Sequence, residues 1–370
     1  MSSLLKDIYN QDFYAPICEA LEELLPDFDR NQFLKQIFCE TFKSMELKQR
    51  MSHSINIIAT CLPSDYPTAV TLLENLIDRL RAKQVREQSF EYMFLPEFIE
   101  THGIDDLETS LSALEYITQF TSCEFAVRPF IHRYGETVLQ RMQRWAEHPH
   151  PMVRRLASEG ARPRLPWAMA LPQLKQDPGP LMAILEKLKQ DESDSVRRSV
   201  ANNLNDISKD NPEFTIAVVK RWQGVHEKTD ALLKHACRSL LKQGNPEILE
   251  LFGYQSQGVE IVNFKLASTR VKFGEAIEFS FGIHNRSARP RKLRIEYAIH
   301  HLKKNGQLTA KVFHISEREL EGASSTDIVR RHQFKPITTR RYYPGGHQVS
   351  VIVNGLESAP LDFELVIVSD

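Results

Sequence analysis

The fold is decided by one stretch of the sequence, WAEHPHPMVRRLASEGARPRLPW at residues 145–167. His150 and Pro151 open a helix there, since proline is well placed in a first helical turn. The apolar positions of this helix are Val153, Leu156, Ala157 and Gly160, which follow the i, i+3, i+4, i+7 spacing of a packed face. Two prolines, Pro163 and Pro166, then end the helix. The sequence therefore predicts a turn beside the helix, with Trp167 on it.

The same stretch is one unit of a repeat. VRRLASE at 153–159 returns as VRRSVAN at 196–202, and more weakly as LKHACRS at 233–239. A period of about 40 residues with paired amphipathic helices is typical of HEAT repeats. Helical spacing continues from about residue 10 to residue 252. We therefore predict a mainly α protein whose residues 1–254 form a HEAT-like α-solenoid.

A polar stripe runs beside the apolar face. Arg155, Glu159 and Arg162 share this stripe in the first unit. The equivalent positions are Arg198, Asn202 and Asn205 in the second unit, and His235, Ser239 and Lys242 in the third. A mostly basic row that continues from repeat to repeat predicts a concave binding surface. The alternative is that the repeat helices simply expose one solvated face.

The hydrophobic period changes from helical to two after Gly258, which predicts strands. Asn305-Gly306 between Leu302 and Leu308 indicates a β-hairpin. We predict a small immunoglobulin-like β-sandwich over residues 257–370, by architecture only, because it has neither a cysteine pair nor a strand tryptophan. Its basic clusters are Arg286, Arg289, Arg291, Lys292 and Arg294, and Arg330, Arg331, Lys335, Arg340 and Arg341. They indicate either solvated loops or a surface for a phosphate backbone.

Charge is distributed unevenly along the 370 residues, although the formal net charge is only −1. Residues 1–120 carry 10 Lys and Arg against 20 Asp and Glu, whereas residues 121–370 carry 37 against 28. A basic majority of this size suits a polyanionic partner. The predicted partner surface therefore lies in the last two-thirds of the chain.

Other features argue against cofactors, disulfides and membranes. The five cysteines are odd in number and lack a CxxC spacing, so we expect free thiols. His148 and His150 flank Pro149 too closely for a convincing metal site and are interpreted as turn and capping residues. The sequence has no nucleotide-binding glycine loop, no signal peptide and no apolar run long enough to span a membrane. We expect a cytoplasmic protein without metal or cofactor.

The two arginine–arginine repeats, VRRLASEGARPRLPW and VRRSVANNLND, resemble the AlkC branch of the DNA alkylation repair glycosylases. The resemblance covers about residues 1–252, and some members of that branch carry a similar immunoglobulin-like extension. It implies a monofunctional DNA glycosylase that removes 3-methyladenine and 3-methylcytosine from duplex DNA and initiates base excision repair. We expect the protein to be a monomer. The resemblance also implies that the lesion is not flipped into a pocket, unlike in most enzymes that act on bases.

The resemblance gives the stripe residues their roles. Glu159 is the first choice for the carboxylate that stabilises an oxocarbenium-like sugar, with Glu124 beside it. Trp167 would lie against the sugar or the cationic base. The predicted DNA-binding residues are Arg155, Arg162, Arg197, Arg198 and Asn202 in the solenoid, and Arg289, Arg291, Arg340 and Arg341 in the sandwich.

Simpler interpretations remain open for these residues. Glu124 would open a helix, where an acidic side chain is favourable with the helix dipole alone. Glu159 would form a surface ion pair with its neighbouring arginines. For the whole chain, the alternatives to an enzyme are a HEAT scaffold for protein partners and a non-catalytic protein that binds DNA structures.

Overall fold

The computed structural model describes residues 4–337 and 340–367. Its internal contacts divide the chain into one unit that ends at Ala236 and a second unit that begins at Cys237. The change from helices to strands comes later, between Leu251 and Val259. Two short helices therefore belong to the same unit as the strands.

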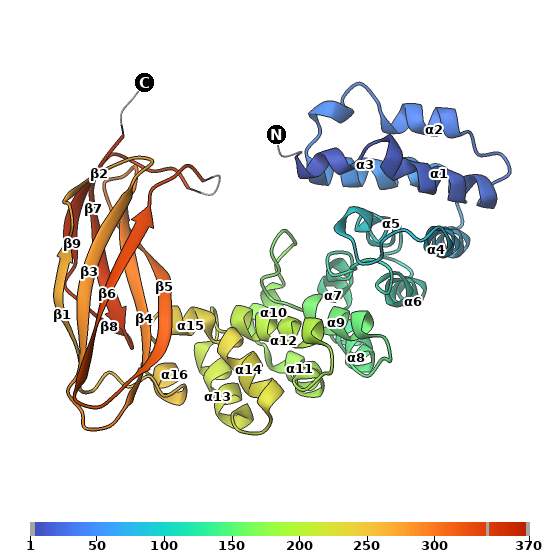
Figure 1. Ribbon diagram of the computed structural model, residues 1–370. Helices are drawn as coiled ribbons and strands as arrows, with labels where there is room; N and C mark the ends of the chain where they lie inside the picture. The colour runs from blue at the N-terminus through green and yellow to red at the C-terminus, as the bar shows by residue number, and fades with distance from the viewer. Residues whose placement is uncertain (1–3, 338–339, 368–370) are drawn as a thin grey trace. The chain divides into compact units, whose positions relative to one another are not determined.

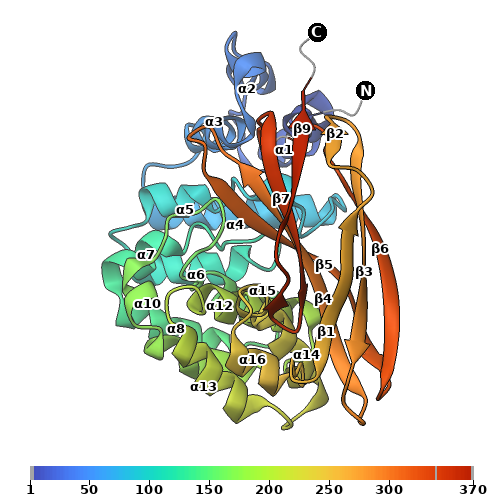
Figure 2. The ribbon, with the colours of Figure 1, turned by 90° about the vertical axis from the view of Figure 1, so that its left-hand side faces the viewer.

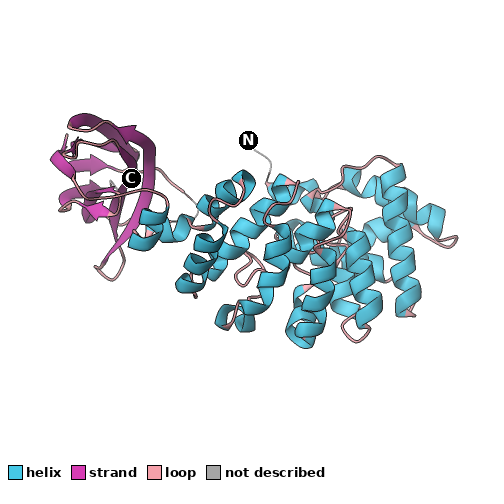
Figure 3. Cartoon of the chain, turned by 90° about the horizontal axis from the view of Figure 1, so that it is seen from below, coloured by secondary structure: helices cyan, strands magenta, loops and turns pink. Residues whose placement is uncertain are grey.

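Among its described residues, the regular elements of the first unit are all helices (Figure 1). Its elements are η1 Leu5–Ile8, α1 Gln11–Leu24, α2 Arg30–Ile37, η2 Phe42–Ser44, α3 Leu47–Ala59, α4 Tyr66–Ala82, η3 Phe90–Tyr92, α5 Glu97–His102, α6 Leu107–Ile117, α7 Arg128–Tyr134, α8 Glu136–Trp145, α9 Pro151–Glu159, α10 Pro172–Gln176, η4 Gly179–Leu181, α11 Met182–Leu188, α12 Asp194–Ile207, α13 Pro212–Trp222 and α14 Glu227–Ala236. Within this unit the labels and colours of Figure 1 follow chain order along a curved row of helices, and Figure 3 shows these helices side by side from another direction.

Local sequence signals fix several of the helix ends. The Asp65 carboxylate caps α4 by accepting from the Thr68 amide, with Pro67 in the first turn. The His150 ring accepts from the Met152 amide at the start of α9, which confirms the predicted capping role. Helix α9 ends at Glu159. It therefore stops before Arg162, three residues earlier than the predicted i, i+4, i+7 stripe requires.

Helix α9 packs between the helices that precede and follow it in the repeat. It contacts α8 and α12, and α12 in turn contacts α14. Val153, Leu156 and Ala157 are buried, as the spacing predicts. The next turn must be small, because a Cβ at Gly160 would lie 2.6 Å from Cγ1 of Val127. This close approach fixes the position of the helix end that carries Glu159.

The first arginine of each arginine–arginine pair holds the loop before its own helix. Arg154 donates to the carbonyls of His148 and Pro149 at 2.9 and 2.8 Å. Arg197, at the equivalent position, donates to the carbonyls of Asp191 and Glu192 at 2.5 and 3.0 Å. The second arginine of each pair, Arg155 or Arg198, is thereby left to face a different environment.

The second unit begins with α15 Arg238–Lys242 and α16 Pro246–Leu251 and continues as a two-layer β-sandwich (Figure 2). Its strands are β1 Val259–Leu266, β2 Arg270–Lys272, β3 Ala276–Asn285, β4 Arg291–Leu302, β5 Leu308–Leu320, β6 Ser324–Gln333, β7 Gly345–Val353, β8 Leu356–Glu357 and β9 Leu361–Val366. One sheet has the order β1-β3-β6; the other has the order β2-β9-β7-β4-β5, with β8 beside β7. The β2–β9 pair is parallel.

The predicted hairpin at Asn305-Gly306 is confirmed. Leu302 pairs with Leu308 at the end of the β4–β5 ladder, and Gly306 has a φ of 79°. Asn354-Gly355 forms a turn of a different kind between β7 and β8, with φ values of 49° and 82° at its two central residues. Positive φ at both central residues matches the right-handed twist of the strands.

The sandwich core contains an unusual group of three buried histidines, His301, His332 and His347. Their rings stand close together, with centroids 6.3 Å apart for His301–His332 and 5.9 Å apart for His301–His347. Burial, followed by the nearby positive charge of Arg340, lowers the pKa of His301 to about 3 and that of His332 to about 4. These histidines are therefore neutral in the folded sandwich.

Candidate functional site

Glu159 lies at the last residue of α9, and only 5% of it is exposed. Its Oε1 accepts a hydrogen bond of 2.6 Å from Nη1 of Arg162. Nη2 of Arg155 lies 3.9 Å from the same oxygen. The structure thus brings the predicted triad of Arg155, Glu159 and Arg162 together. The ion pair between Glu159 and its neighbouring arginines therefore exists, but it is buried and does not lie on the surface as the simpler interpretation of the sequence expected.

Glu124 joins this group through Arg155. Nη1 of Arg155 donates to Oε2 of Glu124 at 2.7 Å and to Oγ of Ser122 at 3.0 Å. The hydroxyl of Ser122 also contacts the Glu124 carboxylate. Helix α7 begins only at Arg128, so Glu124 does not stand in a first helical turn. The helix-dipole explanation therefore does not account for its position.

Asp206 of α12 completes the group and was not predicted. Its Oδ2 accepts from Nε of Arg162 at 2.9 Å, and its Oδ1 accepts from Nζ of Lys209 at 2.9 Å. The residue is almost fully buried, at 1% exposure. The available signal was its position four residues after Asn202, on the same face of the helix. Glu124, Glu159 and Asp206 form, with Arg155 and Arg162, what we call the carboxylate–arginine cluster.

The charges in this cluster stabilise one another. Burial by itself would lower the pKa of Arg155, but Glu124 and Glu159 outweigh it, and the pKa is raised. Likewise, Glu159 and Asp206 overcome the effect of burial and raise the pKa of Arg162. Both guanidinium groups therefore remain charged. A buried carboxylate held between such groups is oriented rigidly at the end of α9.

Arg128 supports the carboxylate–arginine cluster and is fully buried. It donates to the carbonyls of Gly160, Arg162 and Met169 at 2.8, 2.9 and 2.7 Å. Burial, followed by repulsion from the charge of Arg162, lowers its pKa to about 10. One side chain thus ties the end of α9 to the turn that carries Trp167. No sequence pattern indicated this role.

Glu159 reaches the surface in a pocket of about 240 Å³ between α9 and α12. The residues that line it are Arg155, Glu159, Asp194, Ser195, Arg198, Ser199 and Asn202. Arg198 is exposed and has neither a hydrogen bond nor an ion pair within the described part of the chain. Oδ1 of Asn202 lies 3.1 Å from Nε2 of His235. An anionic group can bind at Arg198 in this pocket, and the Glu159 carboxylate then faces the part of the ligand next to that group.

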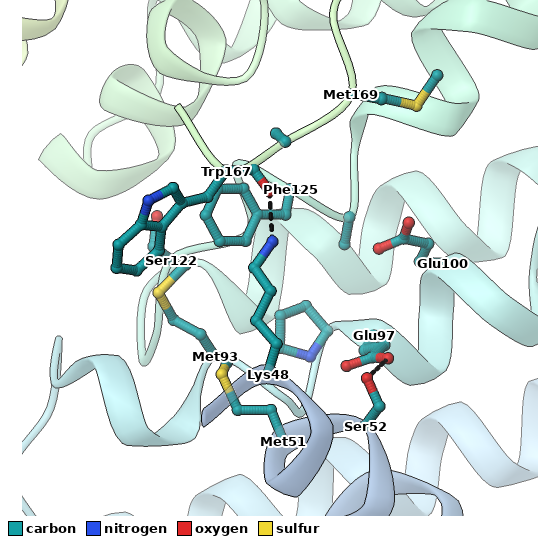
Figure 4. A pocket seen from close by; sticks show the side chains of 13 residues that line it. Lys48, Met51, Ser52, Met93, Glu97, Glu100, Ser122, Phe125, Trp167 and Met169 are labelled. Carbon is teal, nitrogen blue, oxygen red and sulfur yellow. Dashed lines mark hydrogen bonds between the residues drawn. The ribbon is translucent and has the colours of Figure 1, made fainter. Parts of the chain in front are cut away.

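Trp167 lies on a turn after α9, as the sequence predicts, but it does not line the same pocket as Glu159. It is 72% exposed and has a φ of 67°, which for a bulky residue indicates a constrained turn. It lines a neighbouring pocket, which does not include Glu159 (Figure 4). Lys48 donates to its backbone carbonyl. An exposed indole held on a fixed backbone is suited to stack against a ligand that comes from solution.

The remaining predicted arginines fall into two groups. Arg197 contacts Asp194 as well as two carbonyls, so its donors serve the start of α12. In the sandwich, Arg289 is exposed, whereas Arg291 donates to Oε1 of Gln255 at 2.7 Å. Arg340 and Arg341 line a pocket of about 680 Å³ together with Tyr342 and Tyr343.

One member of the first sandwich cluster proves to be structural. Arg294 is buried between Glu296 and Glu317, at 2.6 and 3.1 Å. It lies on the face of β4 opposite the core residues Leu293 and Ile295, but it is still buried, and a buried charged residue needs partners. The cluster inferred from the sequence is therefore smaller on the surface than its five residues suggested.

Within the residues described, no group of His, Cys, Asp and Glu is arranged to hold a metal ion. Nor is any described helix both long and apolar enough to cross a membrane.

Comparisons with known proteins show which family this chain is similar to. Residues 31–240 match the family model described as "DNA alkylation repair enzyme". Residues 260–367 match a model described as the C-terminal Ig-like domain of the uncharacterised protein YhaZ. The uncharacterized protein YhaZ of Bacillus subtilis is 41% identical over 362 residues, which cover 98% of this chain and 99% of YhaZ.

A solved structure also matches over nearly the whole chain. It is the alkylpurine DNA glycosylase AlkC of Pseudomonas fluorescens, bound to DNA that contains an abasic-site analogue. The two chains share 37% identity with a TM-score of 0.91, over 98% of this chain and 100% of that one.

Proposed function

The chain belongs to the DNA alkylation repair enzyme family, and from this premise we propose that it is a DNA glycosylase. Its substrates are cationic N3-alkylated bases, 3-methyladenine and 3-methylcytosine, in duplex DNA. The observation that carries the proposal is the buried carboxylate of Glu159, held by Arg162 at 2.6 Å in a pocket bordered by the free cation Arg198. The similarity to AlkC, a protein solved with abasic DNA, supports it.

The cluster suits the chemistry of these lesions. An N3-alkylated base carries a positive charge and leaves as a neutral molecule, so positive charge moves onto the deoxyribose as the C1′–N bond breaks. Carboxylates beside C1′ stabilise that charge and accept the proton of the water that adds there. Glu159 is the first candidate for this role, and Glu124, linked through Arg155, is the second.

The lining of the Glu159 pocket supports excision without base flipping by a monofunctional enzyme. Enzymes that flip a base stack it between aromatic or apolar side chains, but the described residues of this pocket are all charged or polar. They also include no lysine, the residue that would form a Schiff base with the sugar.

DNA is held, in this proposal, by a HEAT-like solenoid formed by the repeated helices and by the sandwich. Arg198 and Asn202 border the Glu159 pocket, and Arg155 links Glu159 to Glu124. Arg162 and Arg197 have donors engaged by protein oxygens, so we assign phosphate binding first to Arg198. The exposed Arg289, with Arg291, Arg340 and Arg341, forms the clamp on the sandwich. The enzyme acts as a cytoplasmic monomer.

The decisive experiment is incubation of the protein with duplex DNA treated with a methylating agent, followed by chromatography of the released bases. We expect 3-methyladenine and 3-methylcytosine in the supernatant and abasic sites in the DNA. DNA binding without release of any base would show that the protein is a non-catalytic protein that binds DNA structures. Absence of both binding and release would favour a scaffold for protein partners.

A further inference from the structure

A second pocket adjoins the carboxylate–arginine cluster and has no role in the mechanism above. It has a volume of about 240 Å³ and lies between α3, α5 and the turns that carry Phe125 and Trp167. Ser122 lines this pocket and also contacts Glu124 and Arg155. The pocket is therefore next to the reacting bond of the proposed function, although neither Glu124 nor Glu159 lines it.

The walls of this pocket combine flat apolar surfaces with carboxyl groups. Figure 4 shows Met51, Met93 and Trp167 on one side and the carboxyl groups of Glu97 and Glu100 on the other. Thioethers and aromatic rings adapt to the face of a planar heterocycle. The volume lies below the 300–1,000 Å³ range of sites for drug-sized ligands, so it suits a small ring system.

The charged groups of the pocket differ in whether they already form hydrogen bonds within the protein. Lys48 of α3 donates to the Trp167 carbonyl and lies 5.3 Å from the centroid of the Phe125 ring. Glu97 accepts from the Ser52 hydroxyl. Among the described residues, Glu100 has no hydrogen-bond partner, although it is partly buried. Among the described residues of this wall, Glu100 is the carboxyl group that has both oxygens left for a ligand.

The hydrogen-bonding capacity of Glu100 points to a particular ligand. Burial, followed by repulsion from Glu97, raises its pKa to about 7, against a smaller opposing effect of Lys48. A protonated carboxyl offers one donor and one acceptor side by side. Adenine presents the complementary pair at its amino group and ring nitrogen, which Asn and Gln read in the same way in DNA. A phosphate, in contrast, would be repelled by Glu97.

We propose that this pocket binds the free aminopurine base after its excision, with the base lying against Trp167 and Met93 and paired through its amino group and a ring nitrogen to Glu100. This inference rests on the proposed glycosylase function. A base that stays in the stack until its bond breaks must leave the duplex afterwards, and this pocket lies beside the site of cleavage. Product capture here removes the leaving group from the abasic sugar.

The test is titration calorimetry of the full chain with free 3-methyladenine between pH 6 and 9. The parent protein binds the base, and its affinity falls tenfold for each pH unit above 7, because a proton must be taken up by Glu100. Glu100→Gln keeps the donor and acceptor but has no proton to lose, so its affinity stays constant with pH. Glu100→Met lacks both groups and binds at least tenfold more weakly at pH 7. Glu40→Gln, at an exposed position, serves as the control that matches the parent.

Saturable binding with this pattern of pH dependence supports the pocket. Absence of binding at millimolar base, or a pH profile of Glu100→Gln identical to the parent, overturns it. Should Glu100→Met fail to fold, the comparison of Glu100→Gln with the parent decides alone. Base release from methylated DNA is measured separately. If the protein excises bases but does not bind the free base, only the proposal for this pocket is refuted. If it binds the free base but excises none, the proposed glycosylase function is refuted.

Discussion

Replacement of Glu159 by Gln separates a catalytic from a structural role. The change keeps the shape of the side chain and an oxygen that still accepts from Arg162, but it removes the charge. Arg162 also keeps its contact with Asp206 at 2.9 Å, so no guanidinium is left without a carboxylate partner. We therefore expect a loss of folding stability of about 1–2 kcal/mol, less than the 3–5 kcal/mol typical of a broken buried pair.

The effect on excision should be larger than the effect on stability. A preorganised electrostatic contact to a charge that develops in the transition state is worth about 3 kcal/mol, which corresponds to a rate change of about a hundredfold. DNA binding should persist or improve, since a negative charge beside the phosphates is gone. The measurement is the single-turnover rate of 3-methyladenine release by folded Glu159→Gln protein.

Asp191→Asn provides the matched control. The Asp191 side chain is also largely buried and forms an ion pair with an arginine, with Nε of Arg154 2.6 Å from its carboxylate. It lies outside the carboxylate–arginine cluster. We expect it to lose stability and to excise within about threefold of the parent. If Glu159→Gln also stays within about threefold, a loss of less than 0.7 kcal/mol in transition-state stabilisation, Glu159 is only a partner for Arg162.

Three further predictions concern the clamp, the support of the site and the sandwich core. Replacing Arg340 and Arg341 together by Ala should make the plot of log K against log salt for duplex DNA less steep by about two units, since each phosphate contact contributes about 0.9. Replacing Arg270 and Arg286 by Ala is the control, because both pair with glutamates, and it should leave this slope unchanged. Arg128→Lys cannot reach all three carbonyls and should cost roughly 2–4 kcal/mol of unfolding free energy in chemical denaturation; an unchanged midpoint would contradict its supporting role. The lowered pKa values of His301 and His332 mean that the unfolded chain binds more protons between about pH 4 and 6.5, so the sandwich should lose stability as the pH falls through this window, by about 2 kcal/mol per histidine at pH 5. Hydrogen exchange of β4, β6 and β7, corrected for intrinsic rates, should show this loss, and equal protection at pH 7.5 and pH 5 would refute it.

Much of the fold follows from signals that act over a few residues. Pro151 and the His150 ring fix the start of α9, and the spacing of Val153, Leu156 and Ala157 determines its buried face. The period-two pattern and Asn305-Gly306 determine the strands and one register of the sandwich. Such signals can be recognised in the sequence because caps, turns and periodicity depend on the local backbone. The resemblance carried by the repeated arginine–arginine pairs also led to the correct family.

The site itself depends on contacts between residues far apart in the sequence. Whether an arginine faces DNA or a carbonyl was not visible in the VRR repeats, yet Arg197 binds the loop before α12 whereas Arg198 is left unpaired within the described residues. Only the packing of α12 on α9 brings Asp206 to Arg162, and only the turn before α7 brings Glu124 to Arg155. Buried charges require partners, but the sequence does not specify which ones, because that choice depends on distances set by the packing of whole helices.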